Sequence, residues 1–371
     1  MNETRAILDA YARARAHGTA CALATVTFVA GSSYRRVGAR MLIADDGNWV
    51  GCVSGGCLER DLLRKAAWAM ECGQPSLVTY DTREDGDGVR TPGAGLGCNG
   101  VIEILLEPVP AGGSHAVLEL LQRCSTERIS GGMILFPHDP ALPAIIWEDD
   151  AAPTLPMGLP PELRSDLERC WTSARDRGQA LGLDCISGAM PQRIFVEVLR
   201  PAVQVAVIGA GYDAVAMAAL GVHLGYEVNV VDFRSAVPIP RRAFAGIARY
   251  IQCTPADLPA QLVLDERSVV IVMTHQAQDD LAVLPYVLDS RPAYIGLLGP
   301  RKRARRLLAE CDCEEALGQA NLHAPLGLDL GGGTPAEIAL AAFAEIQATL
   351  SGRAGGALRD LPGPIHARES A

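Results

Sequence analysis

A glycine-containing loop between an apolar stretch and a helical stretch constrains the fold of this chain more than any other feature. Residues 205–208 are wholly apolar, as a parallel strand buried on both faces is. Gly209 and Gly211 follow directly, and Ala214 lies at the start of the helical stretch. In this context the first glycine permits a tight turn, the second lets the backbone approach a pyrophosphate, and a small third residue lets the helix pack closely on the strand. The loop predicts a Rossmann-type nucleotide-binding domain, although such a loop also persists where no nucleotide binds.

Polar residues follow two further apolar stretches in the same half of the chain. Asp232 ends the stretch 227–231 about 20 residues after the glycine loop, where a carboxylate can accept hydrogen bonds from ribose hydroxyls. An aspartate there favours NAD, whereas Arg234 leaves NADP open. His275 comes just after the apolar stretch 269–273, and ligands of open α/β sheets bind beyond the carboxyl ends of the strands. We therefore expect Asp232, Arg234 and His275 to belong to the cofactor-binding residues of this domain.

The sequence divides into two predicted domains and a tail. Residues 1–200 have a mixed α/β pattern with a hairpin signal, Asp-Asp-Gly-Asn, at residues 45–48. Residues 201–350 alternate apolar strands with helical stretches, which predicts a doubly wound parallel sheet. Residues 351–371 contain Gly, Pro and Arg and are expected to form a flexible tail. The predicted fold class is α/β, with an N-terminal mixed α/β domain followed by a C-terminal Rossmann-like domain.

Hydrophobic periodicity also predicts the individual elements. Expected helices span 3–17, 62–71, 115–124, 162–175 and 214–224, and expected strands span 22–30, 40–44, 76–80, 101–106, 133–136, 144–147, 194–199, 205–208, 227–231, 269–273 and 294–297. The last helix is expected to begin after Thr334, because Pro335 suits the first helical position and Glu337 completes a capping box.

A cysteine stands next to paired glycines before the second expected helix. The segment runs Ser54-Gly55-Gly56-Cys57 and places the thiol of Cys57 at a predicted helix N-terminus. The macrodipole and the free amides of a helix N-terminus favour a thiolate, which is reactive and ligates metals. The alternative is a cysteine buried at the start of the helix, as free cysteines often are. The paired glycines favour a functional thiol.

Two more glycine-containing loops lie in the N-terminal domain. Residues 92–100 contain Cys98 and several glycines whose amides can nest an anion, although the pattern fits a flexible surface loop equally well. The other loop carries Arg35, Arg36 and Arg40, whose guanidinium groups suit phosphate oxygens. Three glycine loops at strand ends of one domain predict one shared site for an anionic ligand.

The charge of the chain restricts its partners. A formal net charge of −10 argues against nonspecific binding of nucleic acid, which requires a basic face. Against this acidic background, residues 301–306 read Arg-Lys-Arg-Ala-Arg-Arg. This cluster is either a solvated helix face or a contact for a ligand phosphate or an acidic partner.

The N-terminal residues, the length of the apolar runs and the cysteines indicate the cellular compartment. The N-terminal residues do not resemble a signal peptide, and no apolar run reaches the ~18 residues of a membrane span. The eleven cysteines are odd in number and mostly stand alone in apolar surroundings, which indicates reduced core residues and no zinc ribbon. We therefore expect a cytoplasmic protein that does not bind membranes.

Several motifs together resemble the XdhC/CoxI family. In the N-terminal half they are residues 30–33, 38–41, 54–59 and 97–100, and in the C-terminal half residues 209–213, 230–234, 273–275, 294–299, 327–330 and 331–338. They stand in the family's order and extend over nearly the whole chain apart from residues 111–190 and the tail. The resemblance is specific because two unrelated sets of motifs occur in one chain.

The resemblance implies a maturation factor for molybdenum hydroxylases of the xanthine dehydrogenase or CO dehydrogenase type. Members of this family are described as binding the molybdenum cofactor, supporting its sulfuration with a cysteine desulfurase, and delivering it to the apo-enzyme, often as dimers. Molybdopterin, or its dinucleotide, is anionic, so glycine loops and arginines suit it. The resemblance places Cys57 and Cys98 near molybdenum or its sulfur, and Arg35, Arg36 and Arg40 toward phosphate.

An NAD(P)-dependent oxidoreductase acting on a small substrate is the alternative. His275 is the one acid–base candidate, and a catalytic base normally needs an orienting partner. A scaffold without any small-molecule ligand is a third reading. The residues do not identify the client enzyme, the nucleotide, or whether a reaction is catalysed, although the accessory role is favoured over an enzyme.

Overall fold

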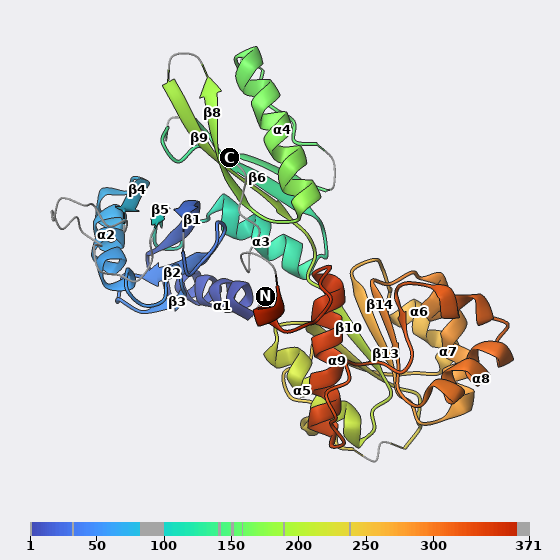
Figure 1. Ribbon diagram of the computed structural model, residues 1–371. Helices are drawn as coiled ribbons and strands as arrows, with labels where there is room; N and C mark the ends of the chain where they lie inside the picture. Colours follow the sequence, from blue (N-terminus) through green and yellow to red (C-terminus); the bar gives the residue numbers. More distant parts are fainter. Residues whose placement is uncertain are drawn as a thin grey trace. The chain divides into compact units, whose positions relative to one another are not determined.

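The computed structural model describes residues 2–31, 33–81, 100–139, 142–149, 152–157, 159–187, 190–236 and 239–361 (Figure 1). The chain forms two compact units, Met1–Pro201 and Ala202–Ala371, and each has its own hydrophobic cores. Within the described residues, none of the helices has both the length and the apolar character that crossing a membrane requires.

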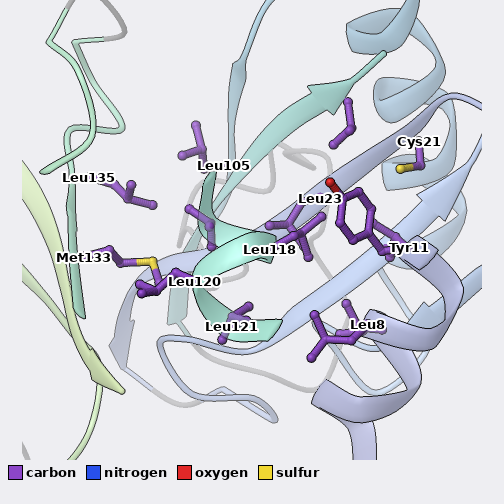
Figure 2. Packing of buried hydrophobic residues seen from close by; sticks show 14 of the residues in the cluster. Leu8, Tyr11, Cys21, Leu23, Leu105, Leu118, Leu120, Leu121, Met133 and Leu135 are labelled. Carbon is purple, nitrogen blue, oxygen red and sulfur yellow. The ribbon is translucent and has the colours of Figure 1, made fainter. Parts of the chain in front are cut away.

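The first sheet of the N-terminal unit is antiparallel and has the strand order β3-β2-β1-β5-β4. Its strands are β1 (Cys21–Gly31), β2 (Arg40–Ala44), β3 (Trp49–Gly51), β4 (Ser76–Asp81) and β5 (Gly100–Val109). Alternate residues of β1 face opposite sides. Leu23 packs against helices α1 (Asn2–His17) and α3 (Ala116–Thr126), and Figure 2 shows this core with Tyr11 of α1 and Leu118 of α3. Ala24 packs on the opposite face, which helix α2 (Glu59–Cys72) covers.

The second sheet of this unit has the strand order β7-β6-β9-β8, and helix α4 (Pro161–Arg177) packs against β8 and β9. Its strands are β6 (Gly131–Leu135), β7 (Ile145–Glu148), β8 (Leu181–Ser187) and β9 (Met190–Leu199). A Cβ atom on Gly182 of β8 would lie 2.1 Å from the carbonyl oxygen of Thr27 in β1, so the two sheets touch through their backbones. Strands β6, β7 and β9 confirm predicted strands, whereas the sequence pattern does not predict β8.

The C-terminal unit has the predicted parallel sheet. The strand order is β12-β11-β10-β13-β14-β15 and every neighbouring pair is parallel. The strands are β10 (Gln204–Ile208), β11 (Glu227–Asp232), β12 (Arg249–Gln252), β13 (Ser268–Val272), β14 (Tyr294–Leu297) and β15 (Leu322–His323). The order reverses direction between β10 and β13, and ligands of such sheets bind at this switch point.

Helices cover both faces of this sheet, which confirms the doubly wound arrangement. Helices α5 (Tyr212–His223) and α9 (Pro335–Leu350) pack on one face through Met217 and Phe343. Helices α6 (Leu258–Gln261), α7 (Ala277–Asp289) and α8 (Arg301–Glu310) pack on the other through residues such as Val283 and Leu307. The described residues of this unit also form short 3-10 helices, which are η1 (Arg241–Ala243), η2 (Pro255–Asp257), η3 (Glu314–Gly318) and η4 (Leu358–Asp360).

The predicted capping box at the start of α9 is confirmed. Thr334 Oγ1 accepts from the amide of Glu337, and the Glu337 carboxylate accepts from the amides of Gly333 and Thr334, both at 2.9 Å. The amides at this helix start are therefore bound within the chain. Of the predicted tail, η4 is described and residues 362–371 lie outside the described residues.

Candidate functional site

The Cys57 loop is held by a carboxylate from the helix that follows it. Glu59 is buried and its carboxylate accepts from the amides of Ser54 and Leu58, each at 3.1 Å, and from the Ser54 hydroxyl. Ser54 Oγ in turn accepts from the amides of Gly56 at 3.2 Å and Leu58 at 3.1 Å. The amides of Gly56 and Leu58 at this helix start, which were expected to be free and to favour a thiolate at Cys57, are therefore bound to Ser54 and Glu59.

The thiol that this loop carries faces solvent. Cys57 is exposed, so the alternative of a cysteine buried at the helix start is wrong. Helix α2 begins at Glu59 with Leu58 as its N-cap, which places Cys57 just before the helix. A Cβ atom on Gly56 would meet nothing within 4 Å, and one on Gly55 would touch the exposed ring of Tyr34 at 3.5 Å. The loop presents its thiol beside open space.

Arg35 lies beside this loop and Arg40 does not. The guanidinium of Arg35 pairs with Glu3, whose other carboxylate oxygen accepts from the amide of Cys52 at 2.9 Å. The structure thus brings Arg35 next to the segment that leads into Ser54. Arg36 is exposed.

Arg40 departs from the expectation of a phosphate contact. Its side chain is buried and pairs with Glu197 of β9, with Nη1 at 3.2 Å from Oε1. The reason is that Arg40 opens β2, at the position where the second sheet packs on the first. Cys98 and the other residues of 82–99, where a glycine-containing loop was predicted, lie outside the described residues.

In the C-terminal unit the glycine loop has the geometry that its sequence predicts. Gly209 has φ +118°, and a Cβ atom on it would lie 2.4 Å from the carbonyl oxygen of Met273, so only glycine fits. Gly211 is the N-cap of α5. Ala214 is fully buried where α5 packs on the sheet.

His275 lies directly on this loop. Its ring would be 3.4 Å from a Cβ atom on Gly211, and its own backbone has φ +61°, in the left-handed region. Its Nε2 is 3.5 Å from Oδ2 of Asp213 in the first turn of α5. Asp213 is a partner for His275 that the sequence argument missed, although it stands within the loop motif itself.

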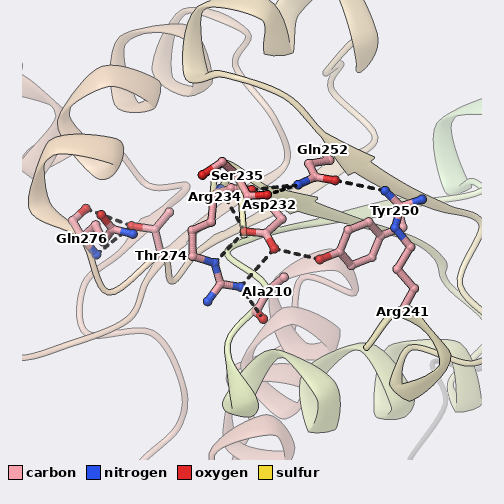
Figure 3. A network of polar contacts seen from close by, with 9 residues as sticks. All are labelled: Ala210, Asp232, Arg234, Ser235, Arg241, Tyr250, Gln252, Thr274 and Gln276. Carbon is pink, nitrogen blue, oxygen red and sulfur yellow. Dashed lines mark hydrogen bonds and ion pairs between the residues drawn. The ribbon is translucent and has the colours of Figure 1, made fainter. Parts of the chain in front are cut away.

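Asp232 is buried at the end of β11 and both of its carboxylate oxygens are engaged (Figure 3). Arg234 Nε donates to Oδ1 at 2.7 Å, and the Tyr250 hydroxyl donates to Oδ2 at 2.8 Å. Arg234 Nη2 also donates to the carbonyl of Ala210 at 2.7 Å. The guanidinium of Arg234 therefore ties β11 to the glycine loop, and a ribose hydroxyl would compete with these donors for Asp232.

The surroundings set the protonation of this cluster. Burial raises the pKa of Asp232, but the hydrogen bonds from Arg234 and Tyr250 outweigh it and the pKa lies below its usual value. Burial and the hydrogen bond to Asp232 raise the pKa of Tyr250 to about 12. Burial, with the nearby carboxylates of Asp280 and Asp232, raises the pKa of Asp279. Asp232 is therefore a carboxylate at neutral pH.

A second buried network adjoins His275. Thr274 Oγ1 donates to Oδ1 of Asp280 at 2.5 Å, and Arg303 of α8 pairs with the other oxygen of Asp280. Asp280 is buried in the first turn of α7. Asp280 was not among the site residues predicted from the sequence. Its signal was an acidic pair, Asp279-Asp280, just after the predicted strand end at Thr274 and His275.

The two units thus offer different chemistry. The N-terminal unit presents an exposed thiol with Arg35 nearby, and the C-terminal unit presents a glycine loop bordered by Arg234 and His275. Among the residues that the structure describes, no three His, Cys, Asp or Glu side chains gather as a metal site would require.

Two family models match the chain. One described as "XdhC Rossmann domain" matches residues 205–346, and one described as "XdhC and CoxI family" matches residues 14–81. A Bacillus subtilis (strain 168) protein, named as a probable subunit of xanthine dehydrogenase, is 27% identical over 332 residues, which are 87% of this chain and 91% of that protein. The Escherichia coli (strain K12) protein "Molybdenum cofactor insertion chaperone PaoD" is 24% identical over 298 residues, which are 80% of this chain and 73% of that protein.

A solved structure has the same fold. A crystal structure described as a xanthine dehydrogenase from Bacillus halodurans superposes with a TM-score of 0.70 at 26% identity, covering 96% of this chain and 98% of that one. The matches fall on both units, in the segments where the motifs of the two halves stand. The chain therefore belongs to the XdhC/CoxI family, and its C-terminal unit is the XdhC Rossmann domain.

Proposed function

We propose that the protein is a maturation factor that binds the molybdenum cofactor, assists its sulfuration, and inserts it into a xanthine dehydrogenase or CO dehydrogenase-like molybdenum hydroxylase. The similarity to the insertion chaperone PaoD supports the cofactor as cargo. The similarity to a protein named for xanthine dehydrogenase supports the class of client. The proposal includes a cysteine desulfurase as sulfur donor, a homodimeric assembly and a cytoplasmic location.

The observation that carries this proposal is the exposed thiol of Cys57 on a loop that Ser54 and Glu59 hold by hydrogen bonds. Ser54 and Glu59 bond to the backbone of the loop, and a Cβ atom on Gly56, the residue before Cys57, would meet nothing within 4 Å. Thiolates ligate soft metals and carry sulfur, which is the chemistry that a molybdenum dithiolene cargo and its sulfuration need. Cys98 is the second thiol of the proposed site.

Phosphate groups of the cargo have candidate contacts in both units. In the N-terminal unit Arg35 and Arg36 are the candidate cations. In the C-terminal unit the Gly209–Gly211 loop, Arg234 and His275 would receive a nucleotide portion, since a glycine loop at a helix N-terminus suits phosphate. Ser54, Gly55 and Gly56 would line the thiol.

The test is the cargo content of the full chain purified from a host that makes the molybdenum cofactor. Molybdenum is measured by mass spectrometry and pterin by fluorescence after oxidation. The wild-type chain is expected to retain both, and Cys57→Ser is expected to retain much less molybdenum. Cys72→Ser is the matched control, because Cys72 is exposed at the other end of the same helix, α2.

Two results would contradict the proposal in different ways. A wild-type chain without pterin would remove the cofactor as cargo. Equal molybdenum in Cys57→Ser and the wild-type chain would remove Cys57 from the site while leaving the cargo in place.

One contact favours the alternative, an NAD(P)-dependent oxidoreductase. The 3.5 Å approach of Asp213 to His275 supplies the orienting carboxylate that a catalytic base needs. Against it, the Asp232 carboxylate that would receive a ribose is already bonded to Arg234 and Tyr250. Turnover of a nicotinamide cofactor that His275→Ala abolishes would support this reading, and turnover unchanged by His275→Ala would exclude it.

A further inference from the structure

Helix α8 concentrates positive charge at its own N-terminus. Its first six residues include five basic ones, and its first turn contains no acidic residue. Arg301, Lys302 and Arg305 are exposed. Pro300 is the N-cap and provides no side-chain hydrogen bond to the first amides.

This arrangement is unfavourable for the isolated chain. Cations at a helix N-terminus oppose the macrodipole, whose positive end lies there. Arg301 and Arg305 stand four residues apart on the helix, as do Lys302 and Arg306, and like charges at that spacing repel. The helix forms in spite of its charges because Ala304, Leu307 and Leu308 bury its other face.

The chain neutralises only part of this charge. Arg303 turns inward to Asp280, and Arg306 pairs with Glu310 with Nε and Oε1 3.3 Å apart. Within the described ranges, no carboxylate lies within 4.0 Å of the charged nitrogens of Arg301, Lys302 or Arg305. These three residues form the α8 basic face.

The α8 basic face adjoins the candidate nucleotide site. Helix α8 follows β14 at the carboxyl edge of the sheet, and Figure 1 shows it next to α7, against which it packs. Arg303 links the first turns of α8 to Asp280 and through it to Thr274, the neighbour of His275. A protein bound on α8 would therefore border the place where the cargo's nucleotide portion is proposed to bind.

We propose that the α8 basic face docks an acidic segment of a partner protein, rich in Asp and Glu. The carboxylates of such a segment would pair with the basic side chains and would interact favourably with the positive end of the helix macrodipole. A free phosphate would be held by exposed side chains alone, whereas the three exposed cations at residues 301, 302 and 305, along little more than one helical turn, can each pair with a separate carboxylate. That the partner is the enzyme receiving the cargo rests on the proposed function, but the docking itself does not.

The experiment uses the full chain and a fluorescein-labelled peptide of alternating Glu and Ala. Fluorescence anisotropy should show binding that weakens as salt rises, because exposed charges are screened. Arg301→Glu/Arg305→Glu is expected to weaken binding about tenfold or more. The matched control is Arg242→Glu/Arg353→Glu, which changes the net charge equally at two exposed arginines elsewhere in the same unit.

The outcomes separate the alternatives. Equal weakening by the control pair would overturn the proposal, since the binding would then reflect overall charge. Competition by pyrophosphate or duplex DNA at concentrations as low as those of unlabelled peptide would also overturn it, in favour of a small anion or a nucleic acid.

Two further measurements keep the result interpretable. The melting temperature of Arg301→Glu/Arg305→Glu should equal or exceed that of the wild-type chain, since glutamates suit a helix N-terminus. If this variant fails to fold, Arg301→Gln/Arg305→Gln replaces it and must still weaken binding for the proposal to stand. Pterin content should be unchanged in the variant, so that a failure of docking is distinct from a failure of cargo binding.

Discussion

The guanidinium of Arg40 and the carboxylate of Glu197 form a buried ion pair between the two sheets of the N-terminal unit. The residues are separated by 157 positions in the chain, and their side chains are 8% and 13% exposed. Arg40 also lies beside the sulfur of Met133 in the core between the sheets. The pair therefore serves the packing of one sheet on the other.

Removing one partner of this pair should destabilise the N-terminal unit. Arg40→Met leaves the Glu197 carboxylate buried without a counter-ion, which is expected to lower the free energy of unfolding by about 3–5 kcal/mol. The double variant Arg40→Met/Glu197→Leu should recover most of that loss, because no charge then remains buried. Urea unfolding measures both. An Arg40→Met variant as stable as the wild-type chain would contradict a role of this ion pair in the packing of the two sheets.

Glu59→Gln should loosen the Cys57 loop. The glutamine would place an NH2 donor at one of the two oxygen positions, which accept from the amide of Ser54 (Oε1) and the amide of Leu58 (Oε2), at an expected cost of about 1–3 kcal/mol in unfolding free energy. Glu71→Gln, at an exposed position of the same helix, is the control and should leave stability unchanged. Thermal unfolding compares the two, and equal melting temperatures would show that Glu59 does not hold the loop.

Substitution by alanine should have different effects at the two glycines of the glycine loop. Gly209→Ala forces a Cβ atom against Met273 at positive φ and should lower the unfolding free energy by about 2 kcal/mol or more. Gly211→Ala meets only the His275 ring at ordinary contact distance and should stay within about 1 kcal/mol of the wild-type chain. Its effect should instead appear as weaker nucleotide binding in a calorimetric titration. Equal destabilisation by the two substitutions would contradict the separate roles of Gly209 in folding and Gly211 in nucleotide binding.

The Asp232 cluster predicts a pH dependence of stability. Because the pKa of Asp232 is lower in the folded chain than its unfolded value, near 4, the unfolded chain binds more protons in this range. Its contribution is complete above pH ~4 and is lost as the pH falls through the folded pKa. Asp232→Asn should therefore flatten the loss of stability below pH ~5 relative to the wild-type chain. Parallel curves of unfolding free energy against pH would contradict this.

Cysteine labelling should follow exposure in the structure. Brief alkylation with iodoacetamide at neutral pH is expected to modify Cys57 and Cys72, while Cys21 and Cys124 react only after unfolding. Burial also raises the pKa of both Cys21 and Cys124 to about 11, which keeps their thiols protonated. Peptide mass mapping reads each site. Bound cargo should protect Cys57 but not Cys72 from alkylation, and protection of both thiols would contradict a cargo site at Cys57.

Much of the fold was predictable because its signals are local. The apolar strand before Gly209, the glycine spacing and the capping box at Thr334 each depend on a few neighbouring residues. The parallel sheet follows from the alternation of such strands with helices. Strand β8 was not predicted although Leu181 and Leu183 alternate with Gly182 and Asp184, because a glycine inside a short segment weakens a strand assignment. Gly182 is required there by the close approach of β1.

The site was less predictable, because its contacts join distant segments. Arg40 and Arg35 were both expected to contact phosphate, yet the ion pair with Glu197 of β9 buries Arg40 while Arg35 stays partly exposed. The partners of Asp232 and His275 depend on strand register and on the turn of a backbone with positive φ, which no spacing rule encodes. The hydrogen bonds from the Ser54 and Leu58 amides to Glu59, which hold the Cys57 loop, likewise have no signal in the residue spacing.

The close approach of Gly209 to the neighbouring strand also affects how the glycine motif is to be interpreted in related sequences. Selection for a folded sheet alone would keep that glycine, so a relative that has lost its nucleotide would still carry it. Gly211, whose place is open apart from the His275 ring, is free to drift once binding no longer matters. Divergence at Gly211, with Gly209 kept, would therefore mark the lineages in which the domain survives as architecture after its ligand has gone.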